Sequence, residues 1–564
     1  MQRRDLFRPK TAALDAVQAE YANRTLPSGL ERSSAGLEPY AGPWGDEQML
    51  HLLRRTTFGV NLTDLALVRT KTLAETVAQL LVVPPLPAPP VNNYSSTADP
   101  TGVFPGATWV TAAYNSTVNG SRTASWKAWW FNEMITLPLS LREKMTLFWH
   151  NHFATETPII DNSRDIYNHH ALLRQFALGN FKELTRRVTL DPGMLRYLNG
   201  NANTKSAPDE NYARELQELF TIGKGPDSRY TEEDVKNAAR VLTGWRINGT
   251  TYTSYFDSTR HDTGNKSFSS FYGSKVITGR SGATAGELEL NDLLDMLFAN
   301  DETAKFLARK LYRFFVYYII DAAVEQNVIT PLAQVIRQNN YEITPALSVL
   351  FNSAHFFDPL NMGCVIKTPL DVTVGLCREF GINAVSTAVP PAALTDAQRY
   401  GIWDHLRTQS SAMQMHIGEP PNVAGWPAYY QEPQFYEIWI NADTLPKRNQ
   451  FTDTMVTTSG YTRSSTRLVV DVIAYAKRFP APADPTALVN DIVRHLYAIP
   501  VSETLKTSLK TGSLLSGQAS DHYWTDAWNA YIANPSDTQA KNAVITRLQA
   551  LLKALMNAAE YQLA

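Results

Sequence analysis

The stretch DENYARELQELFTIGKG, residues 209–225, combines a helical apolar pattern with an unusual density of charge. At 3.6 residues per turn, one stripe gathers its apolar side chains: Tyr212, Leu216, Leu219 and Phe220. Glu215 falls at the edge of this stripe, so we expect its side chain to be half-buried. A half-buried carboxylate needs a cationic partner or a raised pKa. Two interpretations stay open for Glu215: a structural ion pair with a nearby arginine, or a site that moves protons or holds a metal.

Helical periodicity of this kind recurs along most of the 564 residues and predicts a mainly α fold, a large multi-helical bundle-like body with long irregular loops. We expect an N-terminal arm at 1–45, a helical core at 46–440, and a C-terminal helical region at 441–564 that packs on the core. Two excursions interrupt the core: a Pro-, Ser- and Gly-rich surface loop at 83–125, and a small β or irregular segment at 246–285. Individual helices are expected at 11–23, from a cap at Asp46 to a stop at Gly59, and at 73–82, 302–318, 367–380 and 538–559.

Composition and charge restrict the partners and the location of the chain. Its 52 Lys and Arg against 54 Asp and Glu give a formal charge of −2, so no global field would attract nucleic acid or an anionic membrane. No run of about 18 apolar residues is present, so no membrane span is predicted. Cys364 and Cys377 are too few for a zinc ribbon or a disulfide framework. Arg3 and Arg4 resemble a twin-arginine signal, but no apolar run follows them, so we expect no working signal peptide.

FWHNHF, residues 148–153, places His150 and His152 two positions apart. In a strand the two imidazoles would share a face and could ligate one divalent metal; in a helix they turn about 200° apart. The preceding sequence is helical and puts His152 on the apolar stripe of Met145 and Phe148. A shared metal site therefore requires the helix to end near Trp149. The alternatives are a core histidine with satisfied hydrogen bonds and a hydrogen-bonding histidine beside a substrate pocket.

Several other polar residues are candidates for a site. His261 and Asp262, in the irregular segment RHDTGNK, suit metal ligands, a base with its orienting carboxylate, or a simple turn. Arg174 and Arg214 are cations that could orient a carboxylate or bind an anionic substrate group. Arg54 and Arg55 could neutralise Glu215, although structural pairing is the favoured interpretation for them.

The rigid segment EPPNVAGWP, residues 419–427, contains Trp426, the first member of an aromatic group. The other members of this group are Tyr429, Tyr430, Phe435, Tyr436 and Trp439. Such a surface can stack sugars or peptides, and it can equally pack onto the core. Sequence signatures of several large enzyme classes do not occur: P-loop, GxSxG, HExxH, CxxC, and GxGxxG after a strand.

Seven motifs together resemble the bacterial domain-of-unknown-function 1800 family. In chain order they are HLLRRTTFG, KMTLFWHNHF, LRQFALGNFKELTRRVTLDPGMLRYLNG, ENYARELQELFTIG, TEEDVKNAARVLTGW, RHDTGNKSF and PPNVAGWP. The resemblance spans about residues 45–440 and touches the C-terminus through LMNAAEYQLA. It implies no assigned activity. It does imply frequent export and a gene neighbour in a sulfatase-like family, domain of unknown function 1501, and hence a shared envelope or polymer-processing pathway. The chain departs from the family at Asp209, usually Asn, in a shortened approach to PPNVAGWP, and in the missing export signal.

Two hypotheses of different class follow. The first is a hydrolase- or lyase-like enzyme, with metal assistance left open, that acts on an envelope or extracellular polymer. Its pocket would gather the catalytic candidates Glu215, His150, His261 and Asp262, the metal candidates His150 and His152, and the substrate-binding candidates Arg174, Arg214 and Trp426. The second is a non-catalytic binding or assembly protein that works with the sulfatase-like partner. It predicts no convergent polar pocket, and strong destabilisation when Glu215 is removed.

Overall fold

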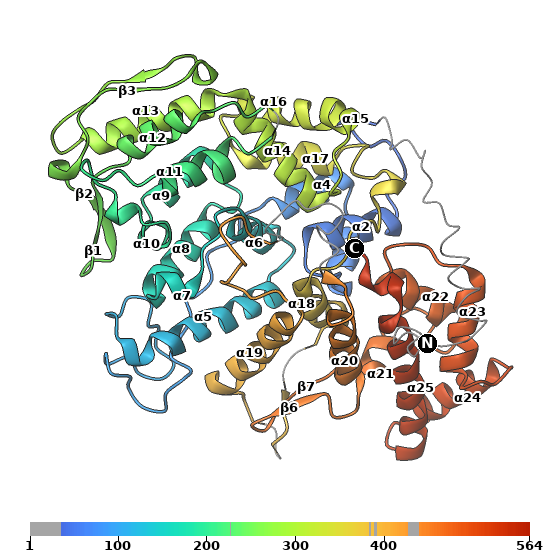
Figure 1. Ribbon diagram of the computed structural model, residues 1–564. Helices are drawn as coiled ribbons and strands as arrows, with labels where there is room; N and C mark the ends of the chain where they lie inside the picture. The colour runs from blue at the N-terminus through green and yellow to red at the C-terminus, as the bar shows by residue number, and fades with distance from the viewer. Residues whose placement is uncertain (1–34, 226, 383–384, 389–391, 427–438) are drawn as a thin grey trace, which may run out of the picture. The chain divides into compact units, whose positions relative to one another are not determined.

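Helices with one buried apolar face build the part of the chain that the structure describes. In α14 (Asp301–Phe315), the buried apolar residues recur every three or four positions: Ala304, Leu307, Ala308, Leu311, Tyr312 and Phe315. The computed structural model describes residues 35–225, 227–382, 385–388, 392–426 and 439–564, and the range from 35 onward forms one unit. The expected helix at 11–23 lies outside the described residues. The predicted mainly α fold is confirmed (Figure 1).

The helices of the predicted core are α2 Asp46–Thr56, α3 Leu62–Val68, α4 Leu73–Leu80, α5 Ser116–Thr136, α6 Arg142–His152, α7 Thr157–Ile160, α8 Ser163–Gln175, α9 Phe181–Thr189, α10 Pro192–Tyr197, α11 Asn211–Glu215, α12 Glu232–Val241, α13 Ala285–Ala299, α14, α15 Ala322–Val324, α16 Thr330–Gln338, α17 Ile343–Phe351, α18 Pro369–Phe380 and α19 Asp396–Ala412. Apart from the two excursions, the longer connections between these helices precede α11, α18 and α19. The helix expected at 302–318 is α14, and the one expected at 367–380 is α18.

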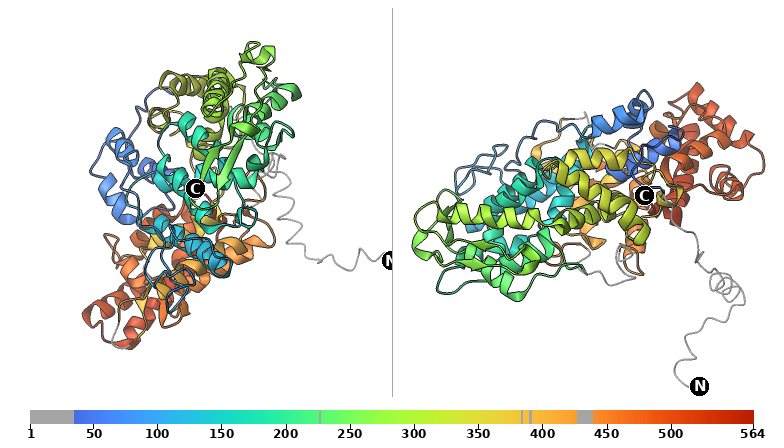
Figure 2. Two further views of the ribbon diagram at one scale, coloured as in Figure 1. Left: turned by 90° about the vertical axis from the view of Figure 1, so that its left-hand side faces the viewer. Right: turned by 90° about the horizontal axis from the view of Figure 1, so that it is seen from above.

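The C-terminal region continues the helical pattern. Its helices are α20 Thr444–Val456, α21 Val472–Ala476, α22 Pro485–Leu496, α23 Glu503–Leu509, α24 His522–Ala533 and α25 Thr538–Asn557. The long helix α25 packs against α20, α21 and α24, while α20 also contacts α19 of the core. Figures 1 and 2 show α22 to α25 at the opposite end of this unit from the hairpins between α12 and α13. The division of the chain near residue 440 stays a prediction.

The sheets among the described residues are small and antiparallel. Strands β1 (Trp245–Asn248) and β2 (Thr253–Phe256) form one hairpin, and β3 (Lys266–Ser267) pairs with β4 (Val276–Ile277). A third sheet has the order β5-β7-β6, with bounds Val385–Ser386, Thr466–Leu468 and Tyr461–Arg463. The first two sheets lie in the segment 246–285, where the sequence predicts a small β excursion.

The expected surface loop at 83–125 needs a correction. Helix α5 begins at Ser116, ten residues before the periodicity predicts it, because Asn115 caps the helix: its Oδ1 accepts from the Thr117 N–H at 3.0 Å. The loop is also partly internal, since Trp109 is buried and Arg122 pairs with Asp99 at 2.8 Å in a buried ion pair. The first core helix differs in a smaller way, because the residue before it, Gly45, takes the cap position that the sequence assigns to Asp46.

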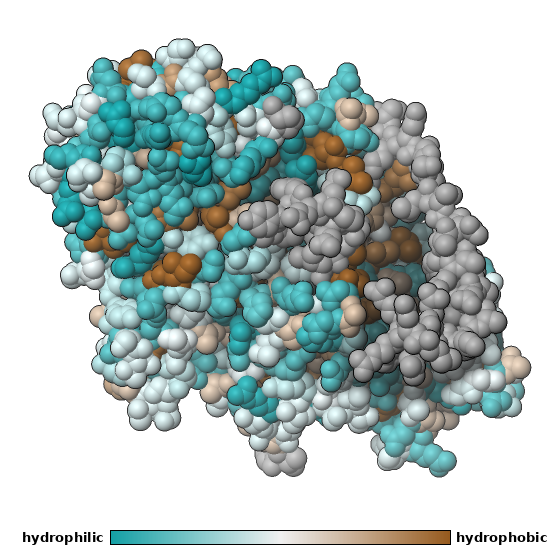
Figure 3. All heavy atoms as spheres, in the orientation of Figure 1, coloured by the Kyte–Doolittle hydropathy of each residue, from teal (hydrophilic) through white to brown (hydrophobic). Residues whose placement is uncertain are grey.

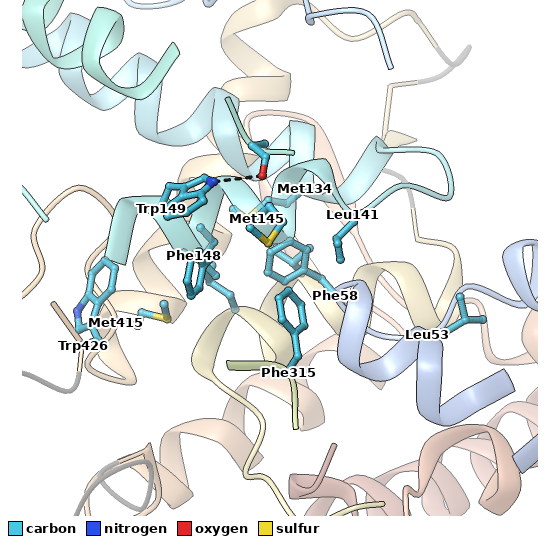
Figure 4. Close-up of a cluster of buried hydrophobic side chains, with 14 of the residues drawn as sticks. Leu53, Phe58, Met134, Leu141, Met145, Phe148, Trp149, Phe315, Met415 and Trp426 are labelled. Atoms are coloured by element: carbon cyan, nitrogen blue, oxygen red, sulfur yellow. Dashed lines mark hydrogen bonds between the residues drawn. The ribbon is translucent and has the colours of Figure 1, made fainter. Parts of the chain in front are cut away.

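Helix α6 lies at the centre of the core that positions the candidate site. Every residue of α6 except Asn151 is buried, including the charged Arg142, Glu143 and Lys144 in its first turn and His150 and His152 in its last turn. Figure 4 shows Met145, Phe148 and Trp149 of this helix among buried residues from other elements, such as Phe315. The Trp149 indole N–H donates to the Ala177 carbonyl at 3.1 Å (Figure 4). Buried polar groups normally have hydrogen-bond partners. A buried polar atom of α6 that lacks such a partner is therefore a candidate for a functional role.

Candidate active site

A cavity of about 480 Å³ lies between α6, α11, α14, α18, α2 and the segment that contains Met415 and Trp426. Its volume falls within the roughly 300–1,000 Å³ typical of small-molecule sites. One wall is apolar and largely aromatic: Phe148, Leu219, Phe306, Phe314, Met415 and Trp426. Figure 4 shows Met415 and Trp426 beside Phe148. The face shown in Figure 3 is mostly hydrophilic, with small apolar groups scattered among the coloured residues.

Glu215 brings a carboxylate into this cavity. The predicted half-burial is confirmed, with Tyr212, Leu216 and Phe220 of the apolar stripe buried. No hydrogen bond or ion pair to its side chain occurs within the described residues, so the structural pair with arginine is not formed there. Burial, and then the nearby Glu218, raises the pKa of Glu215 to about 7. A carboxyl group that titrates near neutrality can give or take a proton during a reaction.

The backbone widens immediately after Glu215. Residues Leu216–Thr221 form a π-helix, in which the Ile222 N–H donates to the Gln217 carbonyl at 2.9 Å. The Thr221 hydroxyl donates to the Leu216 carbonyl at 2.5 Å. The sequence predicts a regular helix here, because the helix ends with the π turn and leaves no later apolar positions whose register could reveal it. Such turns are frequent at functional sites, and this one carries Glu218 and Leu219 on the cavity wall.

His152 also lines the cavity, and it is buried. Its Nε2–H donates to the Phe220 carbonyl at 3.0 Å, which leaves Nδ1 as a hydrogen-bond acceptor. Nδ1 has no partner among the described residues. Burial, and then the charge of Lys310, holds the pKa of His152 well below its ordinary value, so the ring is neutral. The ring therefore holds a buried acceptor atom without a partner among the described residues, surrounded by aromatic rings.

His150 has a separate environment. Helix α6 continues to His152, so the condition for a shared metal site, a helix end near Trp149, is not met. The Nε2 of His150 accepts from the Gly418 N–H at 3.2 Å, and His150 does not line the cavity. Burial lowers its pKa to about 3. Across the described ranges, no group of three or more His, Cys, Asp or Glu side chains is placed to hold a metal ion.

Trp426 lies on the cavity through a close contact between its segment and α6. The Asn151 side chain accepts from the Trp426 N–H at 2.5 Å and donates to its carbonyl at 2.8 Å. Gly425 has a φ of +87°, and a Cβ there would lie 2.4 Å from the Asn151 carbonyl oxygen, so only glycine permits this approach. The nearby aromatic residues Tyr429, Tyr430, Phe435 and Tyr436 lie outside the described residues.

The two arginines expected to bind substrate lie elsewhere. Arg174 forms a buried, two-point ion pair with Glu143, at 2.8 and 2.9 Å, and its guanidinium lies over the Trp129 ring. Arg214 pairs with Glu210 and Glu232 near the surface. Neither lines the cavity. Both side chains are occupied by carboxylates of the protein, which is the structural role of a buried or surface ion pair.

His261 and Asp262 form a second polar network, away from the cavity. Asp262 makes a two-point pair with Arg240, at 2.8 and 3.1 Å. His261 Nδ1 lies 2.9 Å from the Thr243 carbonyl, while its Nε2 faces Glu289 at 3.2 Å. The structure thus brings Glu215, His152 and Trp426 together, and it leaves His150, His261, Asp262, Arg174 and Arg214 outside the cavity.

Helix α14 supplies cavity residues that the sequence analysis missed. Phe306, Lys310, Arg313 and Phe314 lie at three- and four-residue spacing on the face opposite the buried stripe of α14, and all line the cavity. Lys310 lies 5.3 Å from the Phe306 ring centre. Two phenylalanines on the otherwise polar face of an amphipathic helix are the signal that could have found this wall.

A family model matches nearly the whole length of the chain. The model of the family described as protein of unknown function (DUF1800) matches residues 51–563. The chain therefore belongs to this family, and the match includes the C-terminal helical region. No curated protein and no solved structure matches the chain. Within the described ranges, no helix is both long and apolar enough to cross a membrane.

Proposed function

We propose that this protein is a hydrolase-like enzyme in which Glu215 is the general acid–base. The observation that carries the proposal is a half-buried carboxylate in a cavity, with a pKa of about 7 and no partner among the described residues. A group of this pKa is populated in both protonation states near neutral pH, as proton transfer requires.

The aromatic residues in the cavity wall suit a substrate that contains a sugar or aromatic ring. Phe148 and Trp426 provide flat apolar surfaces, which suit sugar or aromatic units of an envelope or extracellular polymer. The residues present supply acid–base chemistry without a bound metal, so the proposed reaction is hydrolysis by a water that Glu215 activates, or hydrolysis with Glu215 protonating the leaving group.

Glu215→Gln tests the proposal. We expect a loss of at least about 100-fold in hydrolysis, the lower end of what acid–base catalysis contributes, with the melting temperature unchanged or raised. Activity is first sought on chromogenic esters, glycosides and sulfate esters, and then on cell-envelope polymers. Glu210→Gln is the matched control, because Glu210 belongs to the same charged segment but pairs with Arg214 and does not line the cavity.

A folded Glu215→Gln protein with full activity would refute the catalytic role. A Glu215→Gln protein that unfolds would instead favour the non-catalytic alternative, a binding or assembly protein for a sulfatase-like partner, in which the charged helix is structural. The enzyme hypothesis thus predicts that Glu215→Gln stays folded, whereas the binding-protein hypothesis predicts that the same variant is strongly destabilised.

A further inference from the structure

The charges around the cavity do not balance. Of its three carboxylates, Asp371 is paired with Lys144 at 2.7 Å and Glu218 with Lys224, which leaves Glu215 alone. On the other side, Arg54 donates to the carbonyls of Arg494 and His495, at 2.9 and 3.0 Å. Arg55 donates to those of Phe315 and Val316, at 2.8 and 3.1 Å. The carboxylates that act on these two guanidinium groups through space are Glu379, which pairs with Lys367, and Asp371, which pairs with Lys144. The Lys and Arg side chains that line the cavity outnumber its carboxylates, so it has an excess of positive charge.

Lys310 is the cation of this cavity that is left without an acceptor. Its ammonium has no hydrogen-bonded or carboxylate partner within the described residues. The Lys310 Nζ lies over the Phe306 ring, 5.3 Å from the ring centre. Its charge reaches His152, whose pKa it helps to lower. Burial, and then Arg313, lowers the pKa of Lys310 to about 8, so the ammonium is still the main form at neutral pH. A partly buried ammonium without an acceptor is unfavourable, and a bound anion would remove this cost.

We infer that the cavity recognises a substrate unit that carries an anionic oxyacid group, a carboxylate, sulfate ester or phosphate ester, next to a ring or alkyl face. Lys310 binds the anionic group, with the charges of Arg54 and Arg55 adding a favourable field. Phe306, Phe314 and Trp426 contact the apolar face. This inference rests on the proposed function, because it names the substrate class of the same site.

Binding of such an anion has a consequence for Glu215. Glu215 and Lys310 line the same cavity, so a negative charge bound in it disfavours the ionised form of Glu215. Affinity is therefore expected to fall as the pH rises through about 7 and 8, where Glu215 and then Lys310 lose their protons. The other titratable or charged groups on this cavity are Arg54, Arg55, Lys144, His152, Glu218, Lys224, Arg313 and Asp371.

Isothermal titration calorimetry of the full chain with a matched pair of probes tests this inference. 4-Phenylbutyrate and its neutral primary amide share one apolar body and differ in charge. We expect the carboxylate to bind at least about tenfold more tightly than the amide to the wild type, as one charge-assisted contact would give. Phenyl sulfate and phenyl phosphate, titrated in the same way, identify which oxyacid group is preferred.

Variants of one helix locate the anion. Lys310→Gln should weaken the carboxylate about tenfold and leave the amide unchanged, whereas Lys310→Arg, which keeps the charge, should retain binding. Lys305→Gln is the matched control, because Lys305 is on α14 and does not line the cavity. Equal binding of carboxylate and amide, no effect of Lys310→Gln, or no binding of any probe would overturn the inference.

The result is separable from the proposed catalysis. Glu215→Gln should retain or tighten 4-phenylbutyrate binding, because it removes the one unpaired negative charge, while hydrolysis is lost. If Glu215→Gln abolishes hydrolysis and Lys310→Gln leaves probe binding intact, the catalytic role stands and the anion site is refuted. If Lys310→Gln weakens the probe and Glu215→Gln keeps full activity, the anion site stands and the catalytic role is refuted.

Discussion

At the scale of single residues, the ionised form of Glu215 is disfavoured by folding. Burial and Glu218 raise its pKa from an ordinary value of 4.5 to about 7, and the opposing charges of Lys224 and Arg214 do not cancel this shift. The folded state therefore binds the proton more tightly than the unfolded state does. The stabilisation from this proton is complete below about pH 4.5 and is lost as the pH rises through about 7.

Glu215→Gln should remove this pH dependence. We expect the variant to raise the free energy of unfolding at about pH 8 by about 1–2 kcal/mol, discounted for the exposed part of the side chain, and to change it little at about pH 4. Urea unfolding at the two pH values measures the difference. Glu232→Gln should act in the opposite direction at the higher pH, because Arg214 lowers the pKa of Glu232. Equal effects of Glu215→Gln at both pH values would contradict the argument.

Residue spacing predicts the face on which a side chain lies but not the group it meets. The half-burial of Glu215 follows from the stripe of Tyr212, Leu216 and Phe220 in one helix. The partner of Arg174 does not follow, since Glu143 is 31 positions away and meets it because α6 packs on α8. From the sequence, Glu215 could equally have formed an ion pair with a nearby arginine or remained unpaired in a functional site. Tertiary packing decides which of these two arrangements occurs.

At the scale of elements, the widened turn Leu216–Thr221 determines how Glu215, Glu218 and Leu219 face the cavity. The persistence of α6 through His152 is foreseeable from the helical stripe that precedes it, and so is the separation of the two histidine rings. The π turn is not foreseeable in this way. It adds one residue to a turn, but the helix ends at Thr221, so no further periodic positions follow that would reveal the change of register.

Thr221→Val tests the role of the π turn. The substitution keeps the shape of the side chain but removes the hydroxyl donor to the Leu216 carbonyl, so we expect a loss of about 1 kcal/mol in unfolding free energy and reduced activity. Thr185→Val in α9 is the control, because the Thr185 hydroxyl makes a similar buried bond to the Phe181 carbonyl within a regular helix. It should cost comparable stability and spare activity. Loss of activity in both variants would exclude a specific role for the turn.

At the scale of the whole described unit, the position of each cavity wall depends on contacts between distant segments. Short-range pattern predicts most helices of the core, yet it cannot bring α14 next to α6 or keep His261 away from Glu215. Those outcomes depend on long-range packing, such as the contact of α12 with β3 and α13, that holds the His261 network at one end. The candidate residues chosen from the sequence therefore belong to two separate groups. Glu215, His152 and Trp426 line the cavity, whereas His261 and Asp262 belong to a polar network away from it.

The C-terminal helices are bound to the core through buried groups on both sides. Arg54 of α2 donates to the carbonyls of Arg494 and His495, and the ring of His495 lies 2.9 Å from the Val60 carbonyl. Tyr561 donates to the buried Glu379 of α18 at 2.9 Å. These bonds join elements separated by more than 180 positions in the chain. The region 441–564 thus completes the hydrogen bonding of the core.

Truncation after residue 440 should therefore abolish folding of the remainder. It would leave the guanidinium of Arg54 and the carboxylate of Glu379 without those partners, at about 1–3 kcal/mol for each unsatisfied group, and would expose the apolar surface now covered by the C-terminal helices. Losses of this size exceed a total stability of about 5–15 kcal/mol once the apolar surface is included. Circular dichroism and calorimetry of the truncated chain, beside the single cooperative transition expected for the full chain, provide the measurement. A cooperative melt of the fragment would instead make the core an independent domain, and the cavity residues Arg54 and Arg55 would then owe their positions to the core alone.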